Sequence, residues 1–118
     1  MPLDGSAHAE RALRYAIQFE RIVPVELMLL HVAESEVIAP AEAYLEAMAA
    51  AVRPHVRSVS IHVEQGEPAS AIVAHAELHE VVLVVMSAHG HTGIRRVILG
   101  SVTREVISVR SVAVLAVV

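Results

Sequence analysis

Apolar and polar positions along the chain alternate between two spacings. Segments in which apolar side chains recur every three or four residues predict helices, and short apolar runs bounded by polar residues, glycine or proline predict strands. The helical pattern covers four segments, which are Ala7 to about Arg21, Ala41–Val52, Ala69–His79 and Ser101 to about Val109. The strand pattern covers five segments, which are Pro2–Leu3, Val25–Val32, Val59–Val63, Val81–Met86 and Val112–Val118.

The order of these segments places a helix between each strand and the next. Strands that alternate with helices predict parallel pairing through crossover connections, which are right-handed. Val81–Met86 and Val112–Val118 are apolar throughout, which suits a sheet covered on both faces. We therefore predict an α/β fold with an open, doubly wound, five-stranded parallel sheet and about four helices. No linker or repeat divides the 118 residues, so we expect one domain over residues 1–118.

The first predicted strand is short for a central strand. Only Met1, Pro2 and Leu3 precede the turn and helix-cap signature Asp4-Gly5-Ser6. A truncated chain or a misassigned start would account for this. A strand of this length loses ladder hydrogen bonds and buried area, so we expect it to be weak.

Composition removes several classes of function. The formal net charge of −4 leaves no electrostatic footprint for duplex nucleic acid, so we expect no nucleic-acid partner. The two longest apolar runs are far shorter than a membrane span, and the N-terminus lacks a secretory pattern, so we expect a cytoplasmic protein without a membrane partner. The absence of cysteine excludes thiolate metal sites, and the absence of lysine excludes a Walker A phosphate loop.

Candidate chemistry gathers where the strands end. In open parallel sheets ligands bind at the carboxyl ends of the strands, and the segment Ser87–Ser101 follows one of them. Its glycines allow a ligand close to the backbone, and Gly100-Ser101 opens a helix whose free N–H groups favour an anion. Ser101 is expected to cap that helix, with Arg95 and Arg96 nearby. The alternative is a capped helix after a glycine-bearing connection, which needs no ligand.

Several motifs together resemble the universal stress protein family along almost the whole chain. They are Asp4-Gly5-Ser6, Leu30-His31-Val32, Gly66-Glu67-Pro68 and Gly90-x₉-Gly100-Ser101. The resemblance implies a Rossmann-like sheet with strand order 3-2-1-4-5 and a homodimer that pairs through the last strand, Val112–Val118. The apolar, uncharged character of that strand supports edge pairing independently.

The resemblance is to the ATP-binding branch of that family, whose motif is Gly-x₂-Gly-x₉-Gly-(Ser/Thr). It implies an ATP site, with Mg²⁺ on the phosphates, built from Pro2, Leu3, Asp4, Val32, Ser87, His89, Gly90, Gly100, Ser101 and Val102. Ser87 stands in place of the first motif glycine. If that position requires a positive φ, serine lowers the affinity; its hydroxyl could instead bond the ribose.

Three functions remain open at this stage. The first is an ATP-binding regulatory module that acts as a dimer in a stress response. The second is a dimeric interaction protein of the same fold that binds no nucleotide, and the third is an enzyme of the adenine-nucleotide hydrolase type. Without lysine or a recognisable general base, we expect at most slow ATP hydrolysis and no catalytic residues.

The histidines give one further pattern. His75 and His79 stand four residues apart on a predicted helix, which is metal-ligand spacing. We favour two solvated helix histidines over a metal site there. His31 ends a buried strand and is expected to be a hydrogen-bonded structural residue.

Overall fold

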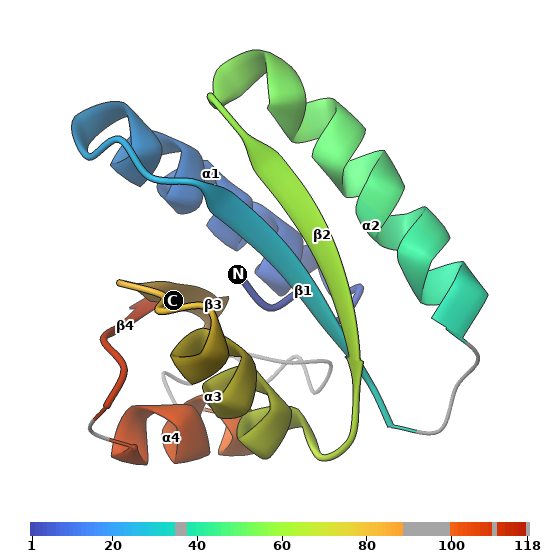
Figure 1. The fold of residues 1–118 in the computed structure, drawn as a ribbon, viewed down its shortest axis with the longest axis vertical. Helices are drawn as coiled ribbons and strands as arrows, with labels where there is room; N and C mark the ends of the chain where they lie inside the picture. The colour runs from blue at the N-terminus through green and yellow to red at the C-terminus, as the bar shows by residue number, and fades with distance from the viewer. Residues whose placement is uncertain (35–37, 89–99, 110, 118) are drawn as a thin grey trace.

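A computed structural model describes residues 1–34, 38–88, 100–109 and 111–117 (Figure 1). The helices are α1 (Ala7–Ile22), α2 (Ile38–Val52), α3 (Pro68–Leu78) and α4 (Ser101–Ser108), with a short 3₁₀ turn at Arg53–His55. The strands are β1 (Leu27–Ala33), β2 (Val59–Gln65), β3 (Val84–Ser87) and β4 (Val114–Val117). The alternation of helices and strands confirms the predicted α/β fold with four α-helices.

All pairing between the named strands is parallel. β1 pairs with β2 from Leu27 opposite Val59 to Ala33 opposite Gln65, and β3 pairs with β4 along its whole length. The predicted first strand is reduced to an isolated parallel bridge between Pro2 and Leu30. The described residues therefore form two two-stranded sheets, and the predicted continuous five-stranded sheet is not seen, because Met1–Leu3 is too short to form a ladder with β1 and β3.

Apolar side chains bury both faces of these strands. On one face α1 and α2 pack over Leu29 and Val85, with Leu45 of α2 fully buried. On the other face α3 and α4 cover Leu30 and Met86. Neighbouring residues of β1 point to opposite faces, as strand geometry requires, and each finds a helical layer. The doubly wound arrangement follows from this alternation.

Several predicted boundaries were wrong, including the start of β1 at Leu27 rather than Val25, and two of the shifts have an identifiable reason. β3 begins at Val84 because Val81 donates its N–H to Ala76 at the end of α3 (2.9 Å) and Val82 is 68% exposed. α2 begins before Pro40, since the first turn of a helix does not need the N–H that proline lacks. The last strand begins two residues later than predicted. None of the helices in the described ranges is long and apolar enough to cross a bilayer.

Candidate functional site

The turn after the first strand holds Asp4 at the carboxyl end of the sheet. Gly5 has a φ of +85°, which a side chain would disfavour, and lets the chain reverse into α1. Ser6 caps α1 by accepting a hydrogen bond at its Oγ from the Ala9 N–H (3.1 Å), and its own N–H donates to Asp4 Oδ1 (2.9 Å). The Asp4 carboxylate is thereby fixed in direction and remains exposed.

The start of α4 is fixed against the end of β3. The Gly100 N–H donates to the Ala88 carbonyl (2.8 Å), and the buried Thr103 hydroxyl donates to the Ser87 carbonyl (2.8 Å). Gly100 is the N-cap and Ser101 the first helical residue, so the prediction that Ser101 caps the helix was wrong. Gly100 has no side chain that could cap α4, so within the described part of the chain the N–H groups of its first turn are candidates to bind an anion.

The structure brings most of the predicted site residues to this end of the strands. Val32 and Val102 pack against the same apolar cluster, although they belong to β1 and α4. Leu3 runs alongside β1, where its N–H donates to the Leu30 carbonyl, whereas Pro2, which bridges to Leu30, borders a cavity at the opposite end of the strands. Ser87 is buried at the end of β3. His89 and Gly90 lie outside the described residues, as do the predicted cations Arg95 and Arg96.

Ser87 fits its position without backbone strain. Among the described non-glycine residues, only Glu80 has a positive φ, at 52°. The first motif glycine of the ATP-binding pattern is therefore replaced at a position that does not need glycine's conformational freedom in this chain. The condition under which serine would lower the affinity, a positive φ, is therefore not met at Ser87.

A series of polar and ring contacts that the sequence did not predict lies beside Asp4. His31 Nδ1 bonds the Leu3 carbonyl (2.8 Å), and because a carbonyl only accepts, Nδ1 carries the proton. The His31 ring meets Tyr44 edge-on at 6.5 Å, and the Tyr44 hydroxyl donates to Glu10 Oε1 (3.1 Å). Burial, followed by the negative charges of Glu10 and Asp4, raises the pKa of Tyr44. The expectation that His31 is a hydrogen-bonded structural residue is confirmed.

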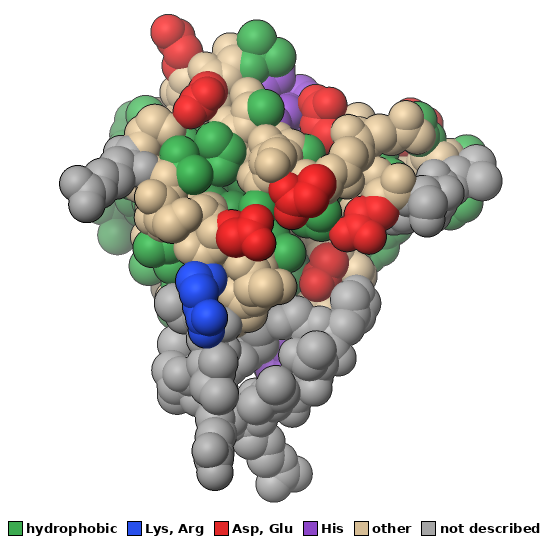
Figure 2. All heavy atoms as spheres, turned by 90° about the horizontal axis from the view of Figure 1, so that it is seen from below, with side chains coloured by type: hydrophobic (Ala, Val, Ile, Leu, Met, Phe, Trp, Pro, Cys, Tyr) green, Lys and Arg blue, Asp and Glu red, His purple; other side chains and the backbone are tan. Residues whose placement is uncertain are grey.

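The charge around this end is mostly negative among the described residues. Figure 2 looks toward the end at which β1 and β2 terminate, and acidic side chains gather there. Arg104 of α4 is the described basic residue nearest in sequence to the start of that helix, where the backbone N–H groups and the Ser101 hydroxyl are the candidate ligands of a phosphate.

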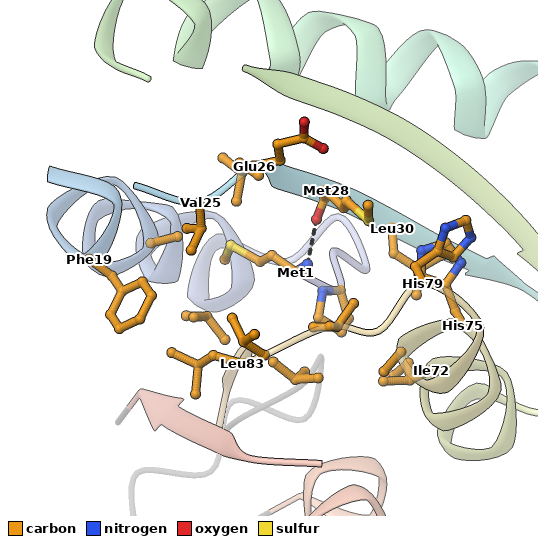
Figure 3. A pocket seen from close by; sticks show the side chains of 18 of the residues that line it. Met1, Phe19, Val25, Glu26, Met28, Leu30, Ile72, His75, His79 and Leu83 are labelled. Atoms are coloured by element: carbon orange, nitrogen blue, oxygen red, sulfur yellow. Dashed lines mark hydrogen bonds between the residues drawn. The ribbon is translucent and has the colours of Figure 1, made fainter. Parts of the chain in front are cut away.

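A cavity of about 280 Å³ lies at the opposite, amino-terminal end of the strands (Figure 3). It separates the starts of β1 and β3, where the two sheets do not join, and its walls are mainly apolar. The Met1 amino group borders it and donates to the Met28 carbonyl. The cavity is thus distinct from the candidate site at the carboxyl ends.

Comparison with known proteins gives consistent matches. The model of the universal stress protein family matches residues 38–117. The chain is 31% identical to Universal stress protein MJ0531 of Methanocaldococcus jannaschii, over 91% of this chain and 73% of that protein.

Two solved structures share the fold over nearly the whole chain. The hypothetical protein MJ0577 has a TM-score of 0.88 and 28% identity, covering 98% of this chain and 91% of its own. A universal stress protein from Archaeoglobus fulgidus in complex with dAMP has a TM-score of 0.78 and 26% identity, covering 98% and 92%.

Proposed function

Because this chain belongs to the universal stress protein family, we propose that it binds an adenine nucleotide where the carboxyl ends of its strands meet the start of α4. The observation that carries this proposal is the pair of hydrogen bonds that fix the uncapped end of α4 against β3, from Gly100 to Ala88 and from Thr103 to Ser87. The dAMP complex of the Archaeoglobus fulgidus relative supports the choice of an adenine nucleotide.

The phosphates would lie at the first turn of α4. Its free N–H groups and the positive end of the helix dipole favour an anion, and Gly100 presents no Cβ to a phosphate that approaches the backbone. The exposed Ser101 can donate a further hydrogen bond from its hydroxyl. We propose ATP as the nucleotide, with Mg²⁺ carried on its phosphates.

The adenosine would lie on the side of the first two strands. The half-buried Val32 offers an apolar contact for the base, and the exposed Asp4 carboxylate can accept hydrogen bonds from the ribose hydroxyls or the adenine amino group. Asp4 already points in one direction because it accepts from the Ser6 N–H. Little conformational freedom would then be lost when the nucleotide binds.

A thermal melt followed by circular dichroism tests this proposal, since the chain contains no tryptophan. At about 100 times its dissociation constant, a ligand stabilises the fold by roughly 2.7 kcal/mol, which raises Tm by several degrees in a domain of this size. We expect this rise with Mg-ATP, a measurable rise with dAMP and none with inorganic triphosphate. No rise with either nucleotide at millimolar concentration would refute the site.

The rival function is a dimeric regulatory protein that binds no nucleotide. Its support is Ser87, which replaces a motif glycine and whose side chain is buried at the end of β3. The melt separates the two functions, because the rival predicts no nucleotide effect. In either case we propose a regulatory role in a stress response rather than catalysis.

We also propose that two copies of the chain pair through β4. β3 borders one edge of β4, and among the described strands nothing pairs with the other edge. Leu115 is 40% exposed, whereas Val114 packs inward against the apolar cluster between α3 and α4. An apolar, uncharged edge strand of this kind favours pairing with a second copy.

Leu115→Asp is therefore expected to convert the dimer to a monomer, because it places a charge at a partly exposed position of the strand through which the two copies would pair. Sedimentation velocity measures the change, and Leu78→Asp on the exposed surface of α3 is the matched control. If Leu115→Asp sediments as the parent dimer does, β4 is not the interface.

The strand order 3-2-1-4-5 is part of the same proposal. It counts Pro2–Leu3 as strand 1, so β1, β2, β3 and β4 are strands 2, 3, 4 and 5. The observed neighbours β2–β1, β1 with Pro2, and β3–β4 are those that this order requires. Leu3 and Val85 also belong to one buried cluster, which supports a first strand next to β3.

A further inference from the structure

Three histidines from two elements converge between the sheet and α3. His62 belongs to β2, and His75 and His79 stand one turn apart at the end of α3. The ring centroids are 4.7 Å apart for His62 and His75, 5.2 Å for His62 and His79, and 4.2 Å for His75 and His79. One nitrogen of each ring lies within 4.8 Å of the other two. Figure 3 shows the rings of His75 and His79 side by side.

His75 presents a buried nitrogen that has no partner. The residue is 6% exposed, so the prediction that it is solvated was wrong, whereas His79 is exposed as expected. His75 Nδ1 lies 3.3 Å from Glu64 Oε1, and Nε2 is buried with no hydrogen-bond partner. If Nδ1 donates to the carboxylate, the lone pair of Nε2 is buried without a hydrogen-bond donor. Buried polar atoms are nearly always paired, so this nitrogen points to a missing partner.

For two of the three rings, the surroundings favour the neutral form of histidine. Burial lowers the pKa of His62, and the neighbouring His75 and His79 lower it further. Burial likewise lowers the pKa of His75. Neutral imidazole is the form of histidine that binds metals.

We propose that His62, His75 and His79 together bind one Zn²⁺ ion. Imidazole suits zinc, and three protein nitrogens with a water molecule as the fourth ligand are a common zinc arrangement. With Zn–N bonds of about 2.0–2.1 Å, tetrahedral ligand nitrogens are roughly 3.4 Å apart, so a pair of nitrogens at the upper limit of 4.8 Å must close by about an ångström and a half. The exposed His79 side chain has room to make most of this movement.

Two neighbouring side chains fit the role of positioning residues. Metal-binding histidines commonly donate their other ring N–H to a carboxylate, which orients the ring. Glu64 occupies this place for His75. The Ser60 hydroxyl lies 3.0 Å from His62 Nε2 and, by accepting its proton, would leave Nδ1 for the metal.

The zinc site is separate from the proposed nucleotide site. His75 and His79 border the cavity at the amino-terminal ends of the strands, whereas the start of α4 lies at the carboxyl end of β3. An ion there would tie α3 to β2 and stabilise their packing. A positive or a negative result for zinc binding therefore does not bear on the proposed nucleotide site.

Zinc titration of the untagged, metal-free chain tests the proposal, with calorimetry for affinity and circular dichroism for stability. We expect one Zn²⁺ per chain and a Tm that rises by several degrees with saturating zinc. Co²⁺ in the same site should give the intense visible bands of four-coordinate cobalt. His79→Ala should lower zinc affinity at least ~100-fold, and Glu64→Gln about 10-fold or more, with Tm of the metal-free chain nearly unchanged.

The control variant is His55→Ala, which removes an exposed histidine outside the cluster. It should bind zinc as the parent does. His75→Ala is a weaker test because it leaves a cavity at a buried position and can lower the stability of the fold. The variant at the exposed His79 is therefore the decisive one. The proposal is overturned if the parent binds no zinc at one per chain, or if His79→Ala binds as tightly as His55→Ala.

Discussion

Gly100→Val is expected to remove the nucleotide-dependent rise in Tm while the chain still folds. The backbone at Gly100 has φ −59° and ψ 159°, which a branched residue can adopt, so the substitution introduces no left-handed strain. A valine side chain at the N-cap would instead occupy space beside the N–H groups that the phosphates approach. Valine is also a poor N-cap, but this costs the short α4 helix only a part of the domain's stability.

The measurement is the circular dichroism melt of Gly100→Val with and without Mg-ATP. Gly100→Ala and Ser101→Ala serve as graded controls, because the first adds one methyl group and the second removes only a hydroxyl. Both should retain a reduced nucleotide effect. A Gly100→Val variant that ATP stabilises as well as the parent would place the phosphates elsewhere, even if the parent binds ATP.

The order of elements was predictable because each one has a strong local pattern. α1 spans Ala7–Ile22, close to the predicted range, and β2 begins at Val59 as predicted, although Ile61 to Glu64 are all half-buried rather than alternating. The start of β3 was not predictable in the same way. Val81, Val82 and Leu83 are as apolar as the strand that follows them, but Val81 bonds the end of α3 instead. A continuous apolar run does not reveal where a helix end stops and a strand begins.

The candidate site was predictable as far as parallel topology determines it. Residues that follow successive parallel strands meet at one edge, and Asp4, Val32 and Ser101 all follow from this rule. The place of Tyr44 beside the site does not follow from this rule, because its hydrogen bond to Glu10 joins residues 34 apart in the chain, on two different helices.

The histidine cluster was likewise predictable only in part. The spacing of His75 and His79 indicated a shared helix face, but the third ring comes from β2 and is placed by the β1–β2 register, in which His62 lies opposite Leu30. The burial of His75 depends on how α3 packs against the sheet. Local spacing alone therefore favoured two solvated histidines, and only the tertiary contacts reveal three rings together.

Leu29→Ala is expected to be the most damaging substitution to stability. Leu29 is 0% exposed at the middle of β1 and belongs to the cluster that joins α1, α2 and β3, with Leu13, Leu45 and Val85. Truncation of a fully buried leucine removes its transfer free energy and leaves a cavity, which together cost about 2–5 kcal/mol. In a domain of this size Tm should fall by roughly 10–20 °C.

Leu78→Ala is the matched control, because Leu78 is 76% exposed on α3 and the chemical change is the same. Its free energy of unfolding should change by no more than about 0.5 kcal/mol. The contrast tests the two-layer core directly, since Leu29 is costly only if α1 and α2 truly cover that face of β1. If the two variants melted alike, β1 would not lie between helical layers. The pairing of Pro2 and Leu3 with Leu30, and with it the position of Asp4, would then lose its support.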